Sequence, residues 1–194
     1  MKNRTLFFVL MIFLNLGIGS GYYNLRHEIL SPALFCAVEP AMDGSFRVYY
    51  DLGAGFNERD TANANLSHRD NHRPIRIVLP KQDIRAVRID PVDVSADVTL
   101  VDPGFGLFDN FMLHRIEAGN IGFTANIASW KFERRRLQIQ VLRGSNDPYL
   151  VLTGFKPLLD GARADVSLLD RIYRIVWAAL NLLFVGLFYW WVRR

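Results

Sequence analysis

The segment Ile175–Val192 constrains the fold of this chain more than any other stretch, because it contains no charged side chain. As an α-helix it would be about 27 Å long, close to the hydrocarbon core of a bilayer, which is about 30 Å thick. Its only strongly polar side chain is Asn181, and Arg193 and Arg194 follow its end. The aromatic run Tyr189–Trp191 lies beside these arginines, where amphipathic rings favour the headgroup layer. The sequence therefore predicts a membrane-spanning helix here.

A second apolar segment, Thr5–Tyr23, follows the short basic start Met1–Arg4. A basic start, an apolar centre and small residues around Gly17–Gly21 are also typical of a cleaved signal peptide. The apolar run is longer than a usual signal core, however, and it ends in Tyr22 and Tyr23, a pair that suits a membrane interface. We therefore favour an uncleaved membrane helix over residues 5–23 and keep the signal peptide as the alternative.

Basic residues at the outer ends of both segments predict the orientation, because cytoplasmic flanks are enriched in Lys and Arg. These residues are Lys2, Arg4, Arg193 and Arg194. Three arginines at the opposite ends weaken the prediction, namely Arg26, Arg171 and Arg174. We expect residues 1–4 to be a cytoplasmic tail and both termini to be cytoplasmic. The middle, residues 24–166, would then lie outside the inner membrane, in the periplasm where the cell has one.

Residues 24–166 have the pattern of a domain built from short strands. Apolar and β-branched residues alternate with polar ones in short runs that Gly, Pro, Asp and Asn separate. The runs are Phe46–Tyr50, Ile75–Leu79, Val87–Ile89, Val94–Val101, Phe111–Ile116, Gly122–Ile127, Leu137–Leu142 and Tyr149–Thr153. A brief turn is expected at Asp60–Leu66. About eight or nine strands at this spacing predict a mainly β fold, either an antiparallel β-sandwich or a jelly roll.

The helix that contains the C-terminal span is predicted to begin near Ser167. Ser167 can cap a helix, with Asp170 as a shorter version of the acid of a capping box. This helix would cover residues 167–194, start outside the membrane, run into the span without a break and finish in a short cytoplasmic end.

Composition and motifs exclude several functional classes. The net charge is only +4 over 194 residues and Arg134–Arg136 is the one basic run, so we predict no nucleic-acid partner. The single cysteine, Cys36, cannot form an intrachain disulfide, and its apolar neighbours predict a buried core position. The histidines lack metal-ligand spacing, and no nucleophile elbow, phosphate loop or dinucleotide fingerprint is present. We therefore predict a protein that is not an enzyme and needs no cofactor or metal.

The segment Asp51–Asp60, DLGAGFNERD, is the predicted ligand-facing loop. Asp51, Asn57, Glu58 and Asp60 supply oxygens of the kind that Ca²⁺ binds, although their spacing differs from that of an EF-hand. In the alternative, Asp51 and Asn57 bond the backbone of a strand-to-loop turn.

Trp130 is the second candidate for ligand contact. It lies beside Lys131 in ASWKFERRR, residues 128–136, which we expect to form a turn. An exposed aromatic ring next to cations can stack on a sugar or enter lipid headgroups. The alternative is that Trp130 covers one end of the domain core.

Three segments together resemble a domain of a known class of proteins. They are YYDLGAGFNERD (residues 49–60), IVLP (77–80) and VRIDP (87–91). They are similar to a lumenal β-sandwich domain attached to bacterial multi-spanning membrane proteins of cell-envelope polysaccharide assembly. The membrane parts of those proteins are glycosyltransferase-like and use polyprenyl-phosphate sugars. The resemblance covers residues 45–101; the chain departs from the pattern in having two predicted spans and no acidic catalytic loop beside the first.

The resemblance implies a non-catalytic accessory protein of cell-envelope glycan assembly in the inner membrane. Its exported domain would bind a glycan or polyprenyl-linked sugar, or dock onto a multi-spanning membrane glycosyltransferase, with membrane lipid as a further partner. One alternative is a small membrane-anchored glycan hydrolase or transferase, which would need two carboxylates about 5–10 Å apart in a cleft. Another is a purely structural membrane subunit.

The two spans carry polar and small residues at matching depths. Asn15 lies about 16 Å beyond Arg4 along a helix, and Asn181 lies about 18 Å before Arg193. We expect the two amides to bond each other across the helices. Small residues on both segments would let the helices approach closely, namely Gly17, Gly21, Ala179 and Gly186. In the alternative, each asparagine bonds its own helix or the helix of a larger partner.

Overall fold

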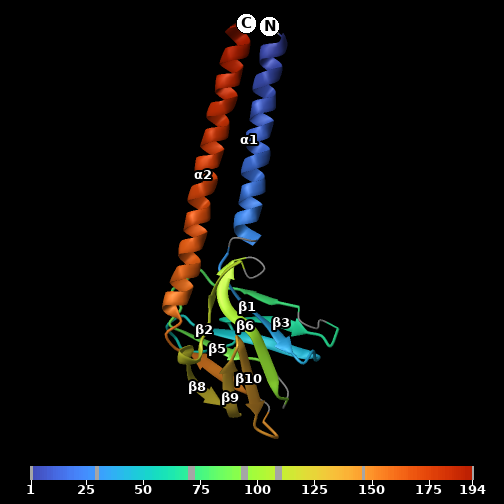
Figure 1. The fold of residues 1–194 in the computed structure, drawn as a ribbon, viewed down its shortest axis with the longest axis vertical. Coiled ribbons are helices and arrows are strands. Elements are labelled where there is room, and N and C mark those ends of the chain that lie inside the picture. The colour runs from blue at the N-terminus through green and yellow to red at the C-terminus, as the bar shows by residue number, and fades with distance from the viewer. Residues whose placement is uncertain are drawn as a thin grey trace.

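The computed structural model describes residues 2–28, 31–69, 73–92, 96–107, 111–145 and 147–193. Two long helices, α1 (Lys2–Glu28) and α2 (Lys156–Arg193), flank a strand-rich part that we call the β-domain. Its described strands are β1 (Ala33–Glu39), β2 (Gly44–Asp51), β3 (Thr61–Leu66), β4 (Ile75–Val78), β5 (Ala86–Asp90), β6 (Val98–Leu107), β7 (Phe111–Arg115), β8 (Ile121–Ala125), β9 (Ile127–Glu133), β10 (Arg136–Val141) and β11 (Tyr149–Leu152), with a short 3-10 helix at Ala118–Asn120. Figure 1 shows the helices rising together from one end of the β-domain, with both termini at the far end. Met1, Arg194 and the first residues of the expected strand Val94–Val101 lie outside the described residues.

The strands form two antiparallel sheets. Sheet A has the order β4-β1-β6-β10-β9, with β7 also paired to β6, and sheet B has the order β3-β2-β5-β11-β8. Most neighbouring strands in the two sheets are not consecutive in the sequence, so residues far apart in the sequence meet on one face. The predicted mainly β fold with antiparallel strands is confirmed.

Alternation of side chains along the strands builds one shared core. In sheet A, Leu34 lies opposite Phe105, and both side chains are buried. In sheet B, Val48 lies opposite Ile89, which are buried as well. All four residues belong to a single hydrophobic cluster that draws on both sheets. The predicted core position of Cys36 is confirmed, and burial raises the pKa of its thiol to about 12.

Two segments that the sequence predicted as turns are strands. Residues 61–66 form β3, paired with β2, whereas we expected a brief turn at Asp60–Leu66. The segment TANANL has little strand propensity of its own, so pairing along the edge of β2 determines its conformation. Likewise, Trp130 lies within strand β9, not in a turn. The reversal between β9 and β10 falls at Arg134 and Arg135, whose φ angles of 46° and 68° are those of a tight hairpin turn.

Helix α2 begins at Lys156, well before the predicted start near Ser167. Pro157 is compatible with a first helical turn, where its missing N–H is not needed. Leu159 and Ala162 are buried and belong to the core cluster of the β-domain. Gly161 weakens the helical pattern in the sequence, but burial of its neighbours holds this turn in place.

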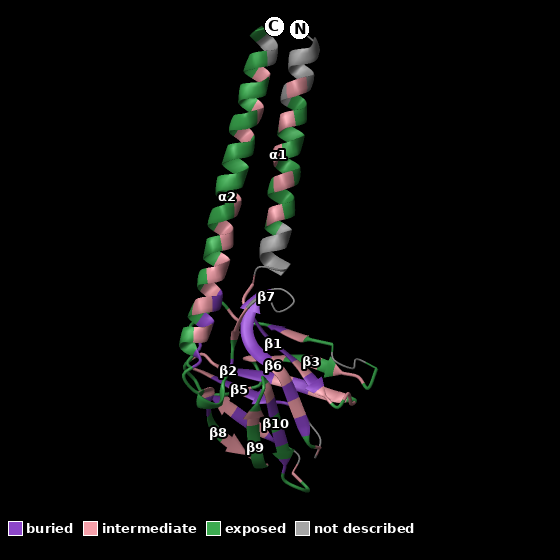
Figure 2. Cartoon of the chain, in the orientation of Figure 1, coloured by how far each residue is buried: buried purple, intermediate pink, exposed green. Residues whose placement is uncertain are grey.

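Helix α2 is long and apolar enough over Lys156–Trp190 to cross a membrane, by length and composition, whereas α1 contains a shorter apolar stretch, Val9–Tyr23. We call the part of α2 beyond Tyr173, which is the part far from the β-domain, its upper part. Figure 2 shows the upper part of α2 as largely exposed, whereas the strands of the β-domain contain many buried residues. The described contacts between the two helices lie near the two ends of α1. Phe7 stacks on Phe188 with ring centroids 4.4 Å apart, and Tyr22 stacks on Tyr173 at 3.8 Å. The hydroxyl of Tyr173 also donates to the carbonyl oxygen of Ile18 at 3.0 Å.

The expected asparagine pair is not formed. Asn15 donates to the carbonyl of Met11 at 2.9 Å, and Asn181 donates to that of Trp177 at 2.8 Å, so each amide bonds its own helix. This is the alternative that the sequence left open, and it gives the NH2 group of each amide a partner within its own helix.

The expected close approach at the glycines is also not observed. A methyl group added at Gly17, Gly21 or Gly186 would meet no described atom within 4 Å. Aromatic rings form the described contacts between the helices, because stacked rings keep the backbones too far apart for small residues to matter.

Candidate functional site

The predicted ligand loop, Asp51–Asp60, is a turn held by its own side chains. Asp51 Oδ1 accepts hydrogen bonds from the backbone N–H groups of Gly53 at 2.7 Å and Gly55 at 2.9 Å. Both glycines have positive φ, 120° and 80°, a region that other residues rarely adopt. The two backbone hydrogen bonds hold the pKa of Asp51 below its ordinary value. Asp51 therefore shapes the loop.

Asn57 closes the second half of the loop. Its Oδ1 accepts from the N–H groups of Arg59 at 2.9 Å and Asp60 at 3.2 Å, and its Nδ2 donates to Asp60 Oδ2 at 2.8 Å. Among the described residues, no group of three or more His, Cys, Asp or Glu side chains is arranged to hold a metal ion. The side-chain oxygens of Asp51 and Asn57 bond the backbone of the turn, as the alternative interpretation predicted, whereas Glu58 accepts a hydrogen bond from Tyr49.

The outer face of sheet B supplies the side chains beside this loop. Val48 and Ile89 point into the core, so their neighbours on β2 and β5 point outward. Tyr49 lies opposite Arg88 in this register, and Arg47 lies opposite Asp90. The alternation of each strand thus places two arginines and a tyrosine on one face.

Arg88 is the centre of this face. Its guanidinium binds Asp90 through two hydrogen bonds of 2.7 and 2.6 Å, and it binds Asp147 at 2.8 Å. The same group lies over the rings of Tyr149, 3.8 Å from the centroid, and Tyr49, at 4.8 Å. Burial by itself would lower the pKa of Arg88, but the two carboxylates outweigh it and raise that pKa well above its ordinary value. Arg88 is therefore a fixed cation between two aromatic rings.

A pocket of about 420 Å³ opens between this face and the loop. Its volume is within the range of small-molecule sites. The lining residues are Arg47, Tyr49, Phe56, Asn57, Glu58, Arg88 and Asp147. The hydroxyl of Tyr49 donates to Glu58 Oε1 at 3.3 Å, and Phe56 is 37% exposed. The pocket thus combines an accessible aromatic ring with charged and amide groups, an arrangement that suits a ligand rich in hydroxyl groups.

The structure brings together only some of the predicted site residues. Asn57 and Glu58 line the pocket, whereas Asp51 and Asp60 support the loop behind them. Trp130 lies in sheet A and is not among the lining residues of this pocket. Its register partner is the buried Ile139, which places Trp130 on the core side of β9 at the edge of the sheet.

Five pocket residues were not among the predicted site residues, namely Arg47, Tyr49, Arg88, Asp147 and Phe56, of which only Phe56 lies within the predicted loop. The alternation in FRVYY and VRID was a usable signal for Arg47, Tyr49 and Arg88. It places these side chains on the face of β2 and β5 that points away from the core. No local signal marks Asp147, which reaches Arg88 only through the pairing of β11 with β5.

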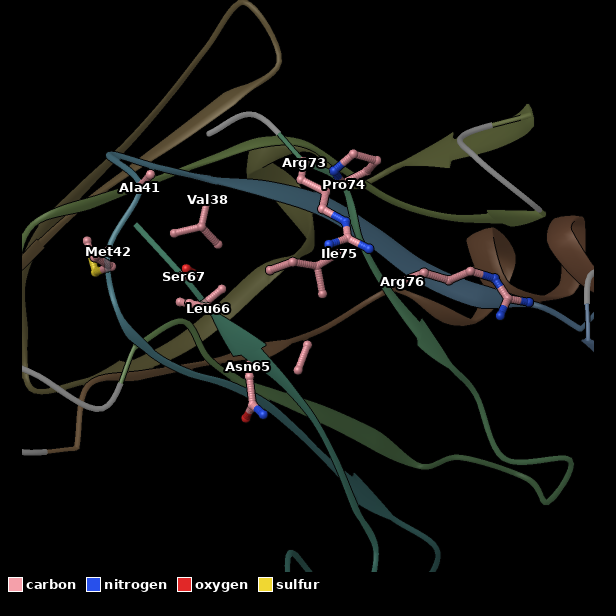
Figure 3. Close-up of a pocket in the computed structure, with 11 residues that line it drawn as sticks. Val38, Ala41, Met42, Asn65, Leu66, Ser67, Arg73, Pro74, Ile75 and Arg76 are labelled. Atoms are coloured by element: carbon pink, nitrogen blue, oxygen red, sulfur yellow. The ribbon is translucent and has the colours of Figure 1, made fainter. Parts of the chain in front are cut away.

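A different pocket, of about 350 Å³, lies where the edge strands β3 and β4 of the two sheets meet. Figure 3 shows Val38, Leu66 and Ile75 around its middle, with Met42 at one side and the guanidinium of Arg76 at the other. Most of its apolar side chains belong to the core cluster or pack against it, and none of its described lining residues is aromatic. This pocket is therefore an open end of the core and lacks the aromatic surface of the pocket on sheet B.

In comparisons with known proteins, no family model, no curated protein and no solved structure matches the chain. The resemblance to an envelope-polysaccharide domain thus stays a prediction.

Proposed function

We propose that α1 and α2 both span the inner membrane as a hairpin, with the two termini in the cytoplasm and the β-domain outside. Three observations support this placement. The upper part of α2 meets the length and composition of a span, its apolar side chains are exposed, and stacked rings join it to α1. The β-domain would then be a periplasmic β-sandwich, its two sheets packed on the shared core. An alkaline-phosphatase fusion after Arg194 should be inactive in this topology, and an active one would contradict it.

We propose that the protein is a non-catalytic accessory protein of cell-envelope glycan assembly, and that the pocket on sheet B binds a glycan or lipid-linked sugar. The observation that carries this proposal is the combination of Phe56, exposed at the pocket, with Asn57 and Glu58 beside it. Sugars present an apolar ring face, which stacks on an aromatic side chain, and a rim of hydroxyl groups, which bind amides and carboxylates. Arg88 and Asp147 add charged groups to one side of the pocket, and their ion pair holds both side chains in place.

Glu58 and Asp147 line the same pocket, and this observation favours a glycan-modifying enzyme as the second candidate function. Each carboxylate already has a partner, Tyr49 for Glu58 and Arg88 for Asp147. These partners hold each carboxylate in a fixed position, which suits binding of sugar hydroxyl groups. Release of reducing ends from the bound glycan, lost in Glu58→Gln, would identify an enzyme in place of a binding module.

The test of glycan binding uses the full chain in nanodiscs on an array of bacterial cell-envelope oligosaccharides. We expect Phe56→Ala to weaken binding about tenfold, the loss of one aromatic contact. Trp130→Ala is the matched control, because Trp130 is exposed to a similar degree, 36%, on the other sheet. Equal binding by the wild type and Phe56→Ala, or equal losses in both variants, would show that the pocket is not the glycan site. Docking to a glycosyltransferase would then be the remaining role for the β-domain.

A further inference from the structure

A cavity of about 630 Å³ lies at the junction between the helices and the β-domain, apart from the pocket on sheet B. Gly19 and Tyr22 of α1 form one wall, and Arg163 and Val166 of α2 form another. The end of β4 and the residues after it, from Val78 to Lys81, line the cavity on the β-domain together with Ser31 and Pro32. The cavity therefore joins three parts of the chain that are distant in sequence.

The charged groups of this cavity are cations. Lys81 has no ion-pair partner among the described residues and is exposed. Arg163 is held in place because its Nη2 donates to the carbonyl of Gln82 at 3.0 Å, while its contact with Asp160 is long, at 4.0 Å. None of the described residues that line the cavity is acidic. The cavity thus presents positive charge that an anionic ligand would neutralise.

Tyr22 provides a second and independent indication of a ligand. Its hydroxyl oxygen is buried and has no hydrogen-bond partner among the described residues. The ring itself is fixed by its stack on Tyr173. A buried hydroxyl without an acceptor is unfavourable, and a ligand oxygen that reached it from the adjoining cavity would satisfy it.

The apolar part of the cavity indicates the kind of anion. Val78 is 44% exposed there, and Val166 and Gly19 add further apolar surface. The apolar run of α2 starts at Ile175, directly beyond the stacked Tyr173, so the cavity lies next to the proposed membrane boundary. A free phosphate would leave this apolar surface uncovered, whereas the glycerol and upper acyl chains of a lipid would cover it.

We propose that the junction cavity binds the headgroup of an anionic glycerophospholipid. Lys81 and Arg163 face the phosphodiester, and the hydroxyl of Tyr22 donates to a phosphate or ester oxygen. The inference rests on the proposed membrane placement of both helices and is independent of glycan binding by sheet B.

The test is native mass spectrometry of the full chain released from nanodiscs of phosphatidylglycerol or of phosphatidylcholine. We expect phosphatidylglycerol to remain bound and phosphatidylcholine to be lost. The double variant Lys81→Ala/Arg163→Gln should weaken lipid retention at least about tenfold, the loss of charge-assisted contacts, and Tyr22→Phe should weaken it by a smaller factor. Lys131→Ala is the control, because Lys131 lies on β9 and its charge is paired with Glu133 at 2.7 Å.

Equal retention of both lipids, or an equal loss in Lys131→Ala, would overturn the proposal. Displacement of the lipid by glycerol phosphate in solution would also overturn it and would identify a site for soluble phosphates. Loss of retention in Tyr22→Phe with an unchanged melting temperature would assign the effect to the hydroxyl group. The phosphatase fusion separates these outcomes from a failure of the proposed topology, since it reports orientation whether or not a lipid binds.

Discussion

The two ends of α2 contain similar apolar residues in opposite surroundings. Near the start of the helix, Leu159 is 2% exposed because it packs into the core of the β-domain. Farther along, Leu182 is 73% exposed, although the two side chains are chemically identical. Burial of a leucine stabilises the fold, whereas the exposed apolar stretch of α2 is unfavourable in water. One helix thus joins a protein core to the proposed membrane span without a flexible link.

The attachment of α2 to the β-domain is also more specific than its contact with α1. Gly161 lies so close to the ring of His114 that an added methyl carbon would be 2.5 Å from Cε1. His114 Nε2 lies 2.8 Å from Asp165 Oδ2, which ties β7 to the next turn of the helix. The contacts with α1 are stacked rings and one hydrogen bond. The lower part of α2 therefore belongs to the β-domain.

The largest expected effect comes from shortening the buried leucine. Leu159→Ala should lower the free energy of unfolding of the β-domain by about 2–5 kcal/mol, because it leaves a cavity in the core. Leu182→Ala should leave that free energy nearly unchanged. Urea denaturation of the full chain in detergent, followed by tyrosine and tryptophan fluorescence, measures both. Similar losses in the two variants would contradict the division of α2 into a core part and a lipid part.

A charge introduced in the exposed part of α2 should affect membrane insertion of the helix and not folding of the β-domain. Leu182→Arg is expected to cost about 2.5–3.5 kcal/mol of insertion free energy if this position lies at mid-membrane. Leu142→Arg, at an exposed leucine of the β-domain, is the control and should insert normally. Resistance to alkaline extraction from membranes measures insertion. If Leu182→Arg were extracted no more readily than its control, α2 would not be a span.

The close contact at Gly161 gives a smaller effect. Gly161→Ala should destabilise the β-domain by about 1–3 kcal/mol, since the methyl group overlaps the ring of His114. Gly186→Ala in the same helix should be neutral or slightly stabilising, because open space surrounds that position. Thermal unfolding of the two variants measures the difference. Combining Gly161→Ala with His114→Ala should recover part of the loss, and a double variant no better than the single one would rule out the overlap as the cause.

The smallest effect is expected at the contact between the helices. Tyr173→Phe removes the hydrogen bond to Ile18 and keeps the ring stack on Tyr22, at a cost of about 0.6 kcal/mol. Cysteines at positions 7 and 188, in a Cys36→Ser background, should be joined within one chain by a short bis-maleimide crosslinker, because the side chains there meet while the backbones are too far apart for a direct disulfide. The yield of this crosslink should fall slightly in Tyr173→Phe. Crosslinks formed only between chains would show that the two helices do not pair with each other.

The class of fold could be predicted from the sequence, because local patterns determine it. Alternation in FRVYY and IRIVL reflects strands with one buried face, and the uncharged run after Ile175 meets the length of a span. Strands without that pattern were missed. The segment TANANL is a strand only through its pairing with β2, and the start of α2 is helical despite Gly161 because its neighbours are buried.

The sequence by itself determined the apolar segments, the strand-rich middle and the turn that follows Asp51, since each depends on residues close together in the chain. Only the tertiary structure decided which side chains share a site. The ion pair of Arg88 with Asp147 joins β5 to the residues just before β11, which are distant in sequence, and the order of strands in a sheet is not encoded in local spacing. The same holds for the cavity at the junction, where α1, α2 and β4 meet. Packing of distant elements creates these sites, and periodicity along one segment carries no information about its neighbours in space.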